Sequence, residues 1–311
     1  MGFEENLQDK DDRGPVAWNR KCQVTELLSI VRSALQWSLL VVLSPESAEE
    51  AVSGASSMIM KLRSYIHAIH GKVLRSVFRR TVYLYGHGPI VSFSFDDFPR
   101  SAFTVGGDIL KRYGGRGTYY VAMDLMNSTN ALGEQFEQGD LHLLARDGHE
   151  LASHTRSHLS SREVSFATFC DNVKKGREAI AEMTGLQDSG NFAYPYGDVT
   201  LEAKRKLDLG LASCRGTCGG INGPEIDLSL LRANSLYGDV RQLERAKTLI
   251  RQNQRIKGWL IFYTHDVTEN PSAFGCTPAL LESTVAYAAQ TSRIMTITAV
   301  LAQVRVLTCG S

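Results

Sequence analysis

The sequence has no excess of charge of either sign and few cysteines, and each shortage excludes a class of protein. Its 311 residues include 34 lysines and arginines and 33 aspartates and glutamates, which gives a formal net charge of +1. Binding to nucleic acid over a broad surface needs clustered basic residues, so we expect no nucleic-acid partner. Six scattered cysteines are too few for a disulfide framework in a chain of this length. Because 43% of the residues are apolar, the chain can bury a large core, which excludes a disordered or fibrous protein.

The N-terminal residues do not suggest a secretory leader, and the sequence has no long hydrophobic run. The N-terminal segment MGFEENLQDKDDRG is acidic, whereas a signal peptide begins with basic residues. The most apolar stretch, residues 27–43, is interrupted by Arg32 and Gln36 and is shorter than the about 20 apolar residues that span a membrane. We therefore expect a cytoplasmic protein. Residues 61–80 carry six basic side chains and no acid, so membrane contact through residues 27–80 is an alternative; we favour a helix face that packs on the protein or faces solvent.

From residue 90 onward, short β-type runs alternate with amphipathic stretches of helical length. The expected strands are 90–95, 117–122, a short strand before His154, 191–194, 209–213, 230–235, 259–264 and 293–297. The expected helices are 103–113, 135–146, 166–183, 240–254 and 278–290. This alternation predicts an α/β fold with a parallel sheet, and seven or eight such units suit a (β/α) barrel, here a distorted one with seven or eight strands. Residues 1–85 lack the alternation and are expected to form a helical N-terminal extension of unknown role, which leaves 86–311 as the barrel.

Two groups of potential metal ligands follow the predicted strands. Asp96 and Asp97 end the strand 90–95, and adjacent carboxylates point to opposite sides of a strand unless its end bends. At the carboxyl ends of barrel strands two carboxylates repel each other unless a cation or a proton separates them, which indicates a metal. His154 and His158 are four residues apart, so a helical turn would place both imidazoles on one face. Two histidines and one carboxylate are a typical ligand set of metal-dependent hydrolases.

A third reactive side chain follows the apolar strand 259–264. His265 stands at the end of that strand and therefore at the same face of the barrel. Histidine titrates near neutral pH, so His265 is a candidate general acid. Any one of these strand-end residues alone would be interpreted as structural, but their occurrence at three strand ends of one repeating architecture indicates an active site.

Four motifs occur in a characteristic order. They are Phe-Ser-Phe-Asp-Asp at 93–97, Gly-His-Glu-Leu-Ala-Ser-His-Thr-Arg-Ser-His at 148–158, Phe-Ala-Tyr-Pro-Tyr-Gly at 192–197 and Tyr-Thr-His-Asp at 263–266. Together they resemble the polysaccharide deacetylase family, which includes the nodulation-type chitooligosaccharide deacetylases. The resemblance covers about residues 90–305 and leaves 1–85 unexplained.

The resemblance implies a role for each matching residue. Asp97, His154 and His158 would bind a divalent metal ion, zinc in most members and another transition ion in some. Asp96 would be the general base toward the attacking water, and His265 would be the general acid that protonates the leaving amine. The implied activity is the hydrolysis of the N-acetyl group of an oligo- or polysaccharide that contains N-acetylglucosamine.

The resemblance also implies where an N-acetylated oligosaccharide would bind. Pro195 and Tyr196 would line the substrate groove, and the backbone N–H of Tyr196 would help to hold the oxyanion. Sugar sites often present aromatic platforms, for which Phe98, Tyr196, Tyr237 and Phe274 are candidates.

The chain departs from the family pattern in two motifs. The third motif of the family carries an arginine that orients the catalytic aspartate, and this chain has Ala193 there. The Asp and Trp pair that supports the general acid is not evident either. Arg215 and Arg232 are candidates to replace the missing cation. These departures keep open the alternative of a hydrolase of a non-peptide C–N bond in a small amide or imide. A catalytically silent carbohydrate-binding barrel is a further alternative, which the intact metal-ligand and acid/base candidates disfavour.

Overall fold

A computed structural model describes residues 71, 74–84, 88–186, 189–207 and 210–304. The chain divides into two units, Met1–His70 and Gly71–Ser311, and all described residues belong to the second. The stretch 27–43 and most of the basic stretch 61–80 therefore lie outside the described residues, and the role of the predicted N-terminal extension stays a prediction. Among the helices that are described, none is long and apolar enough to cross a membrane.

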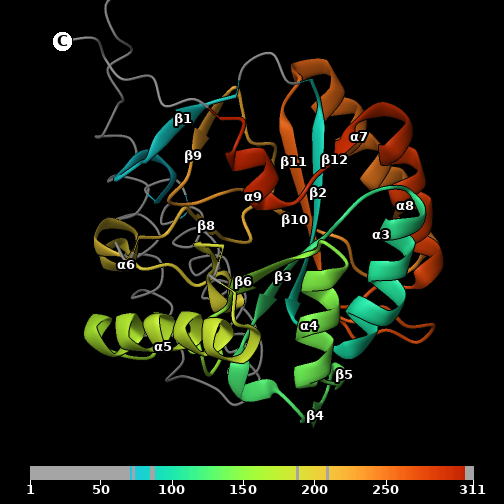
Figure 1. The fold of residues 1–311 in the computed structure, drawn as a ribbon. Coiled ribbons are helices and arrows are strands. Elements are labelled where there is room, and N and C mark those ends of the chain that lie inside the picture. Colours follow the sequence, from blue (N-terminus) through green and yellow to red (C-terminus); the bar gives the residue numbers. More distant parts are fainter. Residues whose placement is uncertain (1–70, 72–73, 85–87, 187–188, 208–209, 305–311) are drawn as a thin grey trace, which may run out of the picture. The chain divides into compact units, whose positions relative to one another are not determined.

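The second unit is built on a curled parallel sheet (Figure 1). Its strands lie in the order β10 (Asn234–Ser235), β11 (Trp259–Thr264), β2 (Ile90–Asp97), β3 (Thr118–Val121), β6 (Glu150–Ser153), β7 (Asn191–Ala193) and β8 (Ser213–Arg215), and β12 (Arg293–Ile294) pairs with the start of β2. Leu231 bridges to Arg215 in β8, and the chain then runs on into β10, so one segment links the two edges of the sheet. The prediction of an α/β fold with a distorted (β/α) barrel of seven or eight strands is confirmed.

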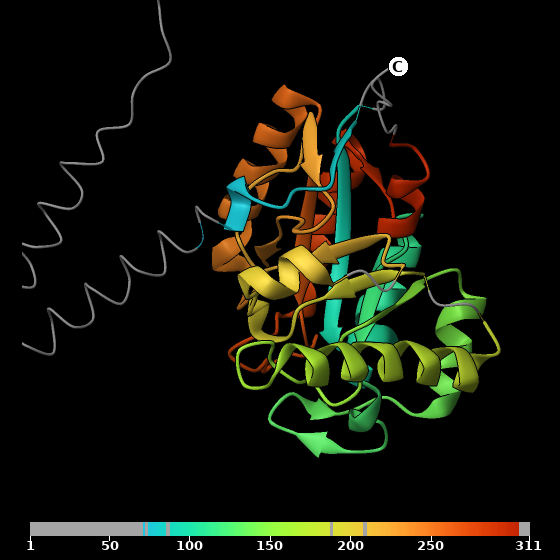
Figure 2. The ribbon, with the colours of Figure 1, turned by 90° about the vertical axis from the view of Figure 1, so that its left-hand side faces the viewer.

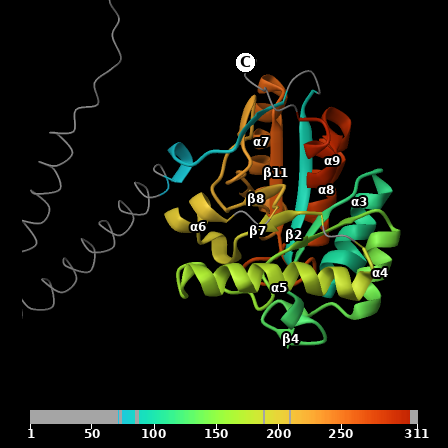
Figure 3. The same cartoon turned by 60° about the vertical axis from the view of Figure 1, so that its left-hand side comes forward.

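Helices cover the sheet and connect its parallel strands. They are η1 (a π-helix, Ala102–Gly107), α3 (Asp108–Arg112), η2 (Met123–Leu125), α4 (Gln138–Arg146), α5 (Phe166–Thr184), η3 (Pro195–Gly197), α6 (Leu201–Lys206), η4 (Val240–Gln242), α7 (Leu243–Ile256), α8 (Pro278–Thr291) and α9 (Ile297–Leu301). Helices α3, α8 and α7 pack in a row along one side, and α5 runs across the carboxyl end of the sheet, where it contacts β6 (Figures 2 and 3). Ser165 and Thr277 cap the N-termini of α5 and α8 with their side-chain oxygens.

Two short antiparallel pairs complete the described fold. Strand β1 (Thr81–Tyr83) pairs with β9 (Glu225–Asp227), and β4 (Thr129–Asn130) forms a hairpin with β5 (Gly133–Glu134). The hairpin lies between β3 and α4, beyond the carboxyl ends of the strands (Figure 1). It therefore belongs to the same end of the sheet as the predicted active site.

The central strands are buried on both faces, as in most parallel sheets. Every residue of β2 and of β11 is buried, and the rings of Phe93 and Phe262 stack between these two strands with centroids 5.7 Å apart. Phe98, which we expected to be a candidate sugar platform, is fully buried and stacks on Phe136 at 5.0 Å. That expectation is wrong, because the chain turns inward directly after β2 and places Phe98 in the core.

Three predicted strands differ from the observed ones, and the one expected at 230–235 is observed only as β10 at Asn234–Ser235. The strand expected at 209–213 is β8 at Ser213–Arg215, because Gly210 has a left-handed backbone (φ 66°) and pairing with β7 begins only at Ser213. The strand expected at 293–297 ends at Ile294, because Thr296 caps helix α9. The difference at β8 matters for the site, since it brings Arg215 into the sheet.

Candidate active site

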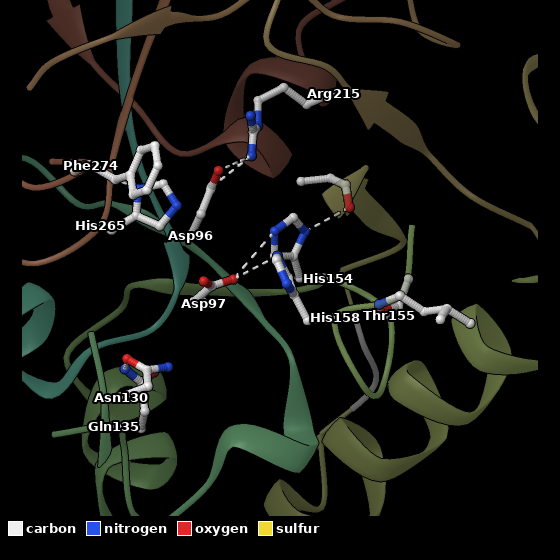
Figure 4. A network of polar contacts seen from close by, with 12 residues as sticks. Asp96, Asp97, Asn130, Gln135, His154, Thr155, His158, Arg215, His265 and Phe274 are labelled. Atoms are coloured by element: carbon white, nitrogen blue, oxygen red, sulfur yellow. Dashed lines mark hydrogen bonds and ion pairs between the residues drawn. The ribbon is translucent and has the colours of Figure 1, made fainter. Parts of the chain in front are cut away.

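A cavity of about 780 Å³ opens at the carboxyl ends of the parallel strands. Its lining includes Asp96 and Asp97 from β2, His154 and His158 from the loop after β6, and His265 from the end of β11. The structure thus brings together all five side chains that the sequence singled out for metal binding and catalysis (Figure 4). They converge because parallel strands present their carboxyl ends at one edge of a sheet.

Asp97, His154 and His158 form the candidate metal-binding group. The Nε2 atoms of His158 and His154 lie 3.1 Å and 3.6 Å from Asp97 Oδ1, and one ligand atom from each residue lies within 4.8 Å of the others. The Nδ1–H of His154 donates to the carbonyl oxygen of Ala193 at 2.8 Å, so the lone pair of Nε2 faces the cavity. Within the described part of the chain, Asp97 Oδ1 is buried and has no hydrogen-bond donor. This set of two imidazoles and one carboxylate fits a divalent transition ion.

A bend at the end of β2 lets both aspartates face the cavity. Asp97 has a left-handed backbone with φ 64°, which is uncommon for a residue other than glycine. On a straight strand Asp96 and Asp97 would point to opposite faces. The bend at Asp97 therefore lets both carboxylates face one site, which a straight strand would prevent.

The segment from His154 to His158 is a loop, so the expected helical turn is wrong. Thr155 and His158 have positive φ angles of 62° and 53°, and four-residue helical spacing does not bring the imidazoles together. The loop is held instead by helix α5, where Asn172 Oδ1 accepts hydrogen bonds from two successive backbone N–H groups of the loop at 3.0 and 3.1 Å. Gly176 allows this approach, since a Cβ atom there would lie 2.6 Å from the carbonyl carbon of Thr155.

Burial sets the protonation states of the three ligands. It lowers the pKa of His154 to about 3 and also lowers that of His158, so both imidazoles are neutral at pH 7, as metal binding requires. Burial raises the pKa of Asp97 from 3.8 to about 6. The ionised carboxylate is therefore unfavourable in the folded protein unless a cation neutralises it.

The raised pKa of Asp97 predicts that Asp97→Asn stabilises the metal-free protein at neutral pH. Between pH 3.8 and about 6 the unfolded chain loses a proton that the native state retains, so the free energy of unfolding falls as pH rises through this range and stays lower above it. Asparagine removes this penalty, which amounts to at most about 3 kcal/mol. Urea unfolding in a chelator should show the variant to be more stable than the parent protein near pH 7.5 and equal to it near pH 4. Equal stability at both pH values would contradict the prediction.

Asp96 is paired with a buried arginine from another strand. Arg215 Nη2 lies 2.6 Å and 2.7 Å from the two carboxylate oxygens of Asp96, and both side chains are buried. The rings of Tyr120 and Tyr263 flank the guanidinium, with its carbon 4.8 Å and 5.1 Å from their centroids. Burial alone would raise the pKa of Asp96, but the charge of Arg215, with smaller contributions from two histidines, holds it below its ordinary value. Asp96 is therefore ionised at neutral pH, a state in which a carboxylate can accept a proton.

Arg215 supplies the cation that is missing at position 193. Ala193 in β7 and Arg215 in β8 are direct partners in the parallel register, so the charge comes from the neighbouring strand. The other candidate, Arg232, donates from Nη1 to the carbonyl oxygen of Gly219. The structure thus decides between the two arginines that the sequence left open.

His265 lies across the two aspartates from His154 and His158 (Figure 4). Its Nδ1 lies 3.1 Å from the carbonyl oxygen of Phe274, and since a carbonyl can only accept, Nδ1 carries the hydrogen. The other ring nitrogen, Nε2, is then the atom that can exchange a proton with a substrate. In place of the carboxylate expected from the family pattern, a neutral backbone carbonyl orients the imidazole.

Comparison with known proteins identifies the family. Residues 85–212 match the family model described as polysaccharide deacetylase. Over these residues the chain is similar to the polysaccharide deacetylases. The family predicted from the motifs is confirmed, and it supports hydrolysis of acetylated carbohydrate, whereas the likeness to nodulation-type members stays a prediction. The match ends before Arg215 and His265.

Several solved structures are similar to the chain. A Mycobacterium smegmatis protein assigned to the polysaccharide deacetylases is 16% identical, with 73% of this chain and 99% of that chain covered and a TM-score of 0.51. A family 4 acetyl xylan esterase from Clostridium thermocellum, in complex with a cobalt ion, is 18% identical (68% and 90% covered, TM-score 0.47). The peptidoglycan deacetylase PdaC from Bacillus subtilis is 14% identical (68% and 90% covered, TM-score 0.43). The first of these shows the shared fold, and no curated protein matches the chain.

Aromatic rings line the cavity beside the polar residues. Tyr196 is 65% exposed and its ring centroid is 4.5 Å from that of His158, while Phe274 is 53% exposed and flanks His265. Tyr237 also lines the cavity. Pro195, which we expected to line the groove, is buried and is not among the residues that line the cavity; it begins the turn η3, in which Tyr196 has a φ of 59°. Pro195 therefore positions the exposed tyrosine.

The cavity also includes residues that the sequence did not single out. Asn130, in the hairpin β4–β5, is the most informative, because its Oδ1 accepts from Leu132 N at 2.8 Å and from Gln135 Nε2 at 3.1 Å. Its amide nitrogen is then available to a ligand. Thr217 and Ser272 add two hydroxyl groups. No motif marks these positions, and only the folded chain places them at the cavity.

Proposed function

We propose that the protein is a metal-dependent deacetylase that hydrolyses the N-acetyl group of a saccharide containing N-acetylglucosamine, with a chitooligosaccharide as the proposed substrate. The observation that carries this proposal is the arrangement of the Asp97, His154 and His158 ligand atoms beside Asp96, which is ionised by its pair with Arg215. A binding protein would have no need of a second carboxylate beside the ligand set.

We propose zinc as the native ion, because two imidazoles and one carboxylate with room for further ligands are typical of catalytic zinc sites. When bound, such an ion supplies Lewis-acid polarisation of the acetyl carbonyl and makes water a stronger nucleophile at neutral pH. The ion would also stabilise the ionised carboxylate of Asp97, which burial disfavours without a nearby cation.

The residues of the chain divide the proton transfers between them. Asp96 accepts a proton from the attacking water, and Arg215 keeps this carboxylate ionised between turnovers. In the proposed step His265 is protonated on both ring nitrogens; it gives the Nε2 proton to the nitrogen of the leaving amine and keeps its Nδ1–H on the Phe274 carbonyl. The exposed rings of Tyr196 and Phe274 flank the sugar, and the backbone N–H of Tyr196 is the proposed donor to the oxyanion.

Acetate release from chitooligosaccharide tests the function directly. We expect the purified full chain to release acetate from N-acetylglucosamine oligomers, to lose at least about 90% of this activity in a chelator, and to regain it with added Zn²⁺. The matched control is the same oligomer without acetyl groups, which should bind without releasing acetate. Turnover of small cyclic amides or imides instead would support the alternative hydrolase, and oligomer binding without any turnover would support a silent binding barrel.

A further inference from the structure

The loop after β11 turns back and places the Phe274 carbonyl beside the proposed general acid. This oxygen accepts from the backbone N–H of His265 at 3.2 Å, from His265 Nδ1–H at 3.1 Å and from the Thr264 hydroxyl at 3.3 Å. The two bonds to His265 fix both its main chain and its ring. The direction of the imidazole therefore depends on the position of residue 274.

A buried carboxylate holds this loop in place without contacting the imidazole. Asp266 is 2% exposed, and its Oδ2 and Oδ1 accept from the backbone N–H and the hydroxyl of Ser272 at 2.8 Å and 2.5 Å. The Ser272 hydroxyl oxygen in turn accepts from the N–H of Phe274 at 3.1 Å. Gly275 packs its backbone against the carboxylate, because a Cβ atom there would lie 2.3 Å from Asp266 Oδ1.

We propose that Asp266 is a positioning residue for the general acid, acting through Ser272 and the Phe274 carbonyl on His265. This inference rests on the proposed function, in which His265 protonates the leaving amine. In the family pattern a carboxylate supports the general acid. In this chain the Asp266 carboxylate acts through Ser272 and Phe274, by holding the loop that carries the Phe274 carbonyl. Phe274 then has two roles, because its ring faces the cavity where the sugar would bind and its carbonyl oxygen orients the imidazole of His265.

Variants of Asp266 and Ser272 test the proposal in the full chain. Asp266→Ala should lower kcat for acetate release from chitooligosaccharide about 10²-fold, the size of a general-acid contribution, with KM changed less than about threefold. Ser272→Ala should act in the same direction with a smaller effect. Asp266→Asn retains one acceptor for the Ser272 N–H and should recover most of kcat.

Two substrates separate acid positioning from a loss of fold. Hydrolysis of 4-nitrophenyl acetate needs no protonation of the leaving group, so Asp266→Ala should change that rate less than about threefold. Asp171→Ala, which removes an exposed carboxylate of helix α5, is the matched control and should leave both rates within about threefold of those of the parent protein. Equal losses on amide and aryl ester in Asp266→Ala, or a rise in KM as large as the fall in kcat, would overturn the proposal.

A spectroscopic measurement makes the inference independent of the proposed substrate. The Nδ1–H of His265 should give a slowly exchanging imidazole proton signal in the parent protein, and this signal should be lost in Asp266→Ala and restored in Asp266→Asn. If the parent protein releases no acetate but shows this pattern, the proposed function fails while the positioning role stands. If the signal persists in Asp266→Ala, the positioning role is wrong whatever the substrate.

Discussion

Replacing Arg215 with methionine is expected to lower kcat for acetate release about 10²- to 10³-fold and to destabilise the fold by about 3–5 kcal/mol at neutral pH. The guanidinium is fully buried and both oxygens of Asp96 bond to it, so the variant leaves a carboxylate without its partner in a dry site. Burial would then dominate and raise the pKa of Asp96, so the carboxylate would hold its proton to a higher pH. The acidic limb of the pH–rate profile should therefore move to higher pH.

The strand register offers a rescue experiment for this prediction. Side chains of directly paired residues on neighbouring strands project from the same face of a sheet, so an arginine at position 193 starts beside the place that Arg215 leaves. Ala193→Arg in the Arg215→Ala background should raise kcat at least about tenfold over that of Arg215→Ala alone. The single variant Ala193→Arg should be less stable than the parent protein, since it crowds two guanidinium groups at one carboxylate. Exposed Arg241 is the control, and Arg241→Met should leave the kinetics unchanged. An unchanged pH–rate profile in Arg215→Met would show that the pair has no catalytic role.

The sequence was sufficient to predict the residues at the ends of strands but could not predict the partner of Asp96. Asp97, His154 and His265 follow apolar runs that read as strands, and parallel strands bring their carboxyl ends to one edge. Arg215 follows a weaker pattern, and the strand expected at 209–213 would have left it outside the sheet. Register between β7 and β8 is a tertiary property, and it alone shows that Arg215 lies opposite Ala193.

Local conformation was the other part that the sequence could not supply. The spacing of His154 and His158 suits a helical turn, yet the chain holds them in a loop with positive φ at Thr155 and His158. Tertiary contacts stabilise such a backbone, here the hydrogen bonds that Asn172 in α5 accepts from the loop. No local sequence pattern predicts these contacts. The same reasoning applies to Phe98, whose burial follows from the bend at the end of β2.

Removal of a metal ligand has the largest effect that the site predicts. His154→Ala should lower acetate release by at least about 10³-fold, because the ion's contribution of several kcal/mol to the transition state is lost together with the ion. His158→Ala should behave alike, since its Nε2 lies 3.1 Å from the same carboxylate oxygen. Elemental analysis of the purified variants should find less than about a tenth of the parent protein's metal content, because the two remaining ligands bind the ion much more weakly than three.

The measurement of metal-dependent stability separates ligand loss from damage to the fold. Zinc should raise the melting temperature of the parent protein, because an ion that binds only the native state stabilises it, and it should have no such effect on His154→Ala. His142 lies exposed on helix α4, away from the ligand group, so His142→Ala is the matched control and should keep metal content, the zinc-dependent shift and activity. A His154→Ala protein that retains its metal and releases acetate at the parent rate would show that Asp97, His154 and His158 do not form the metal site.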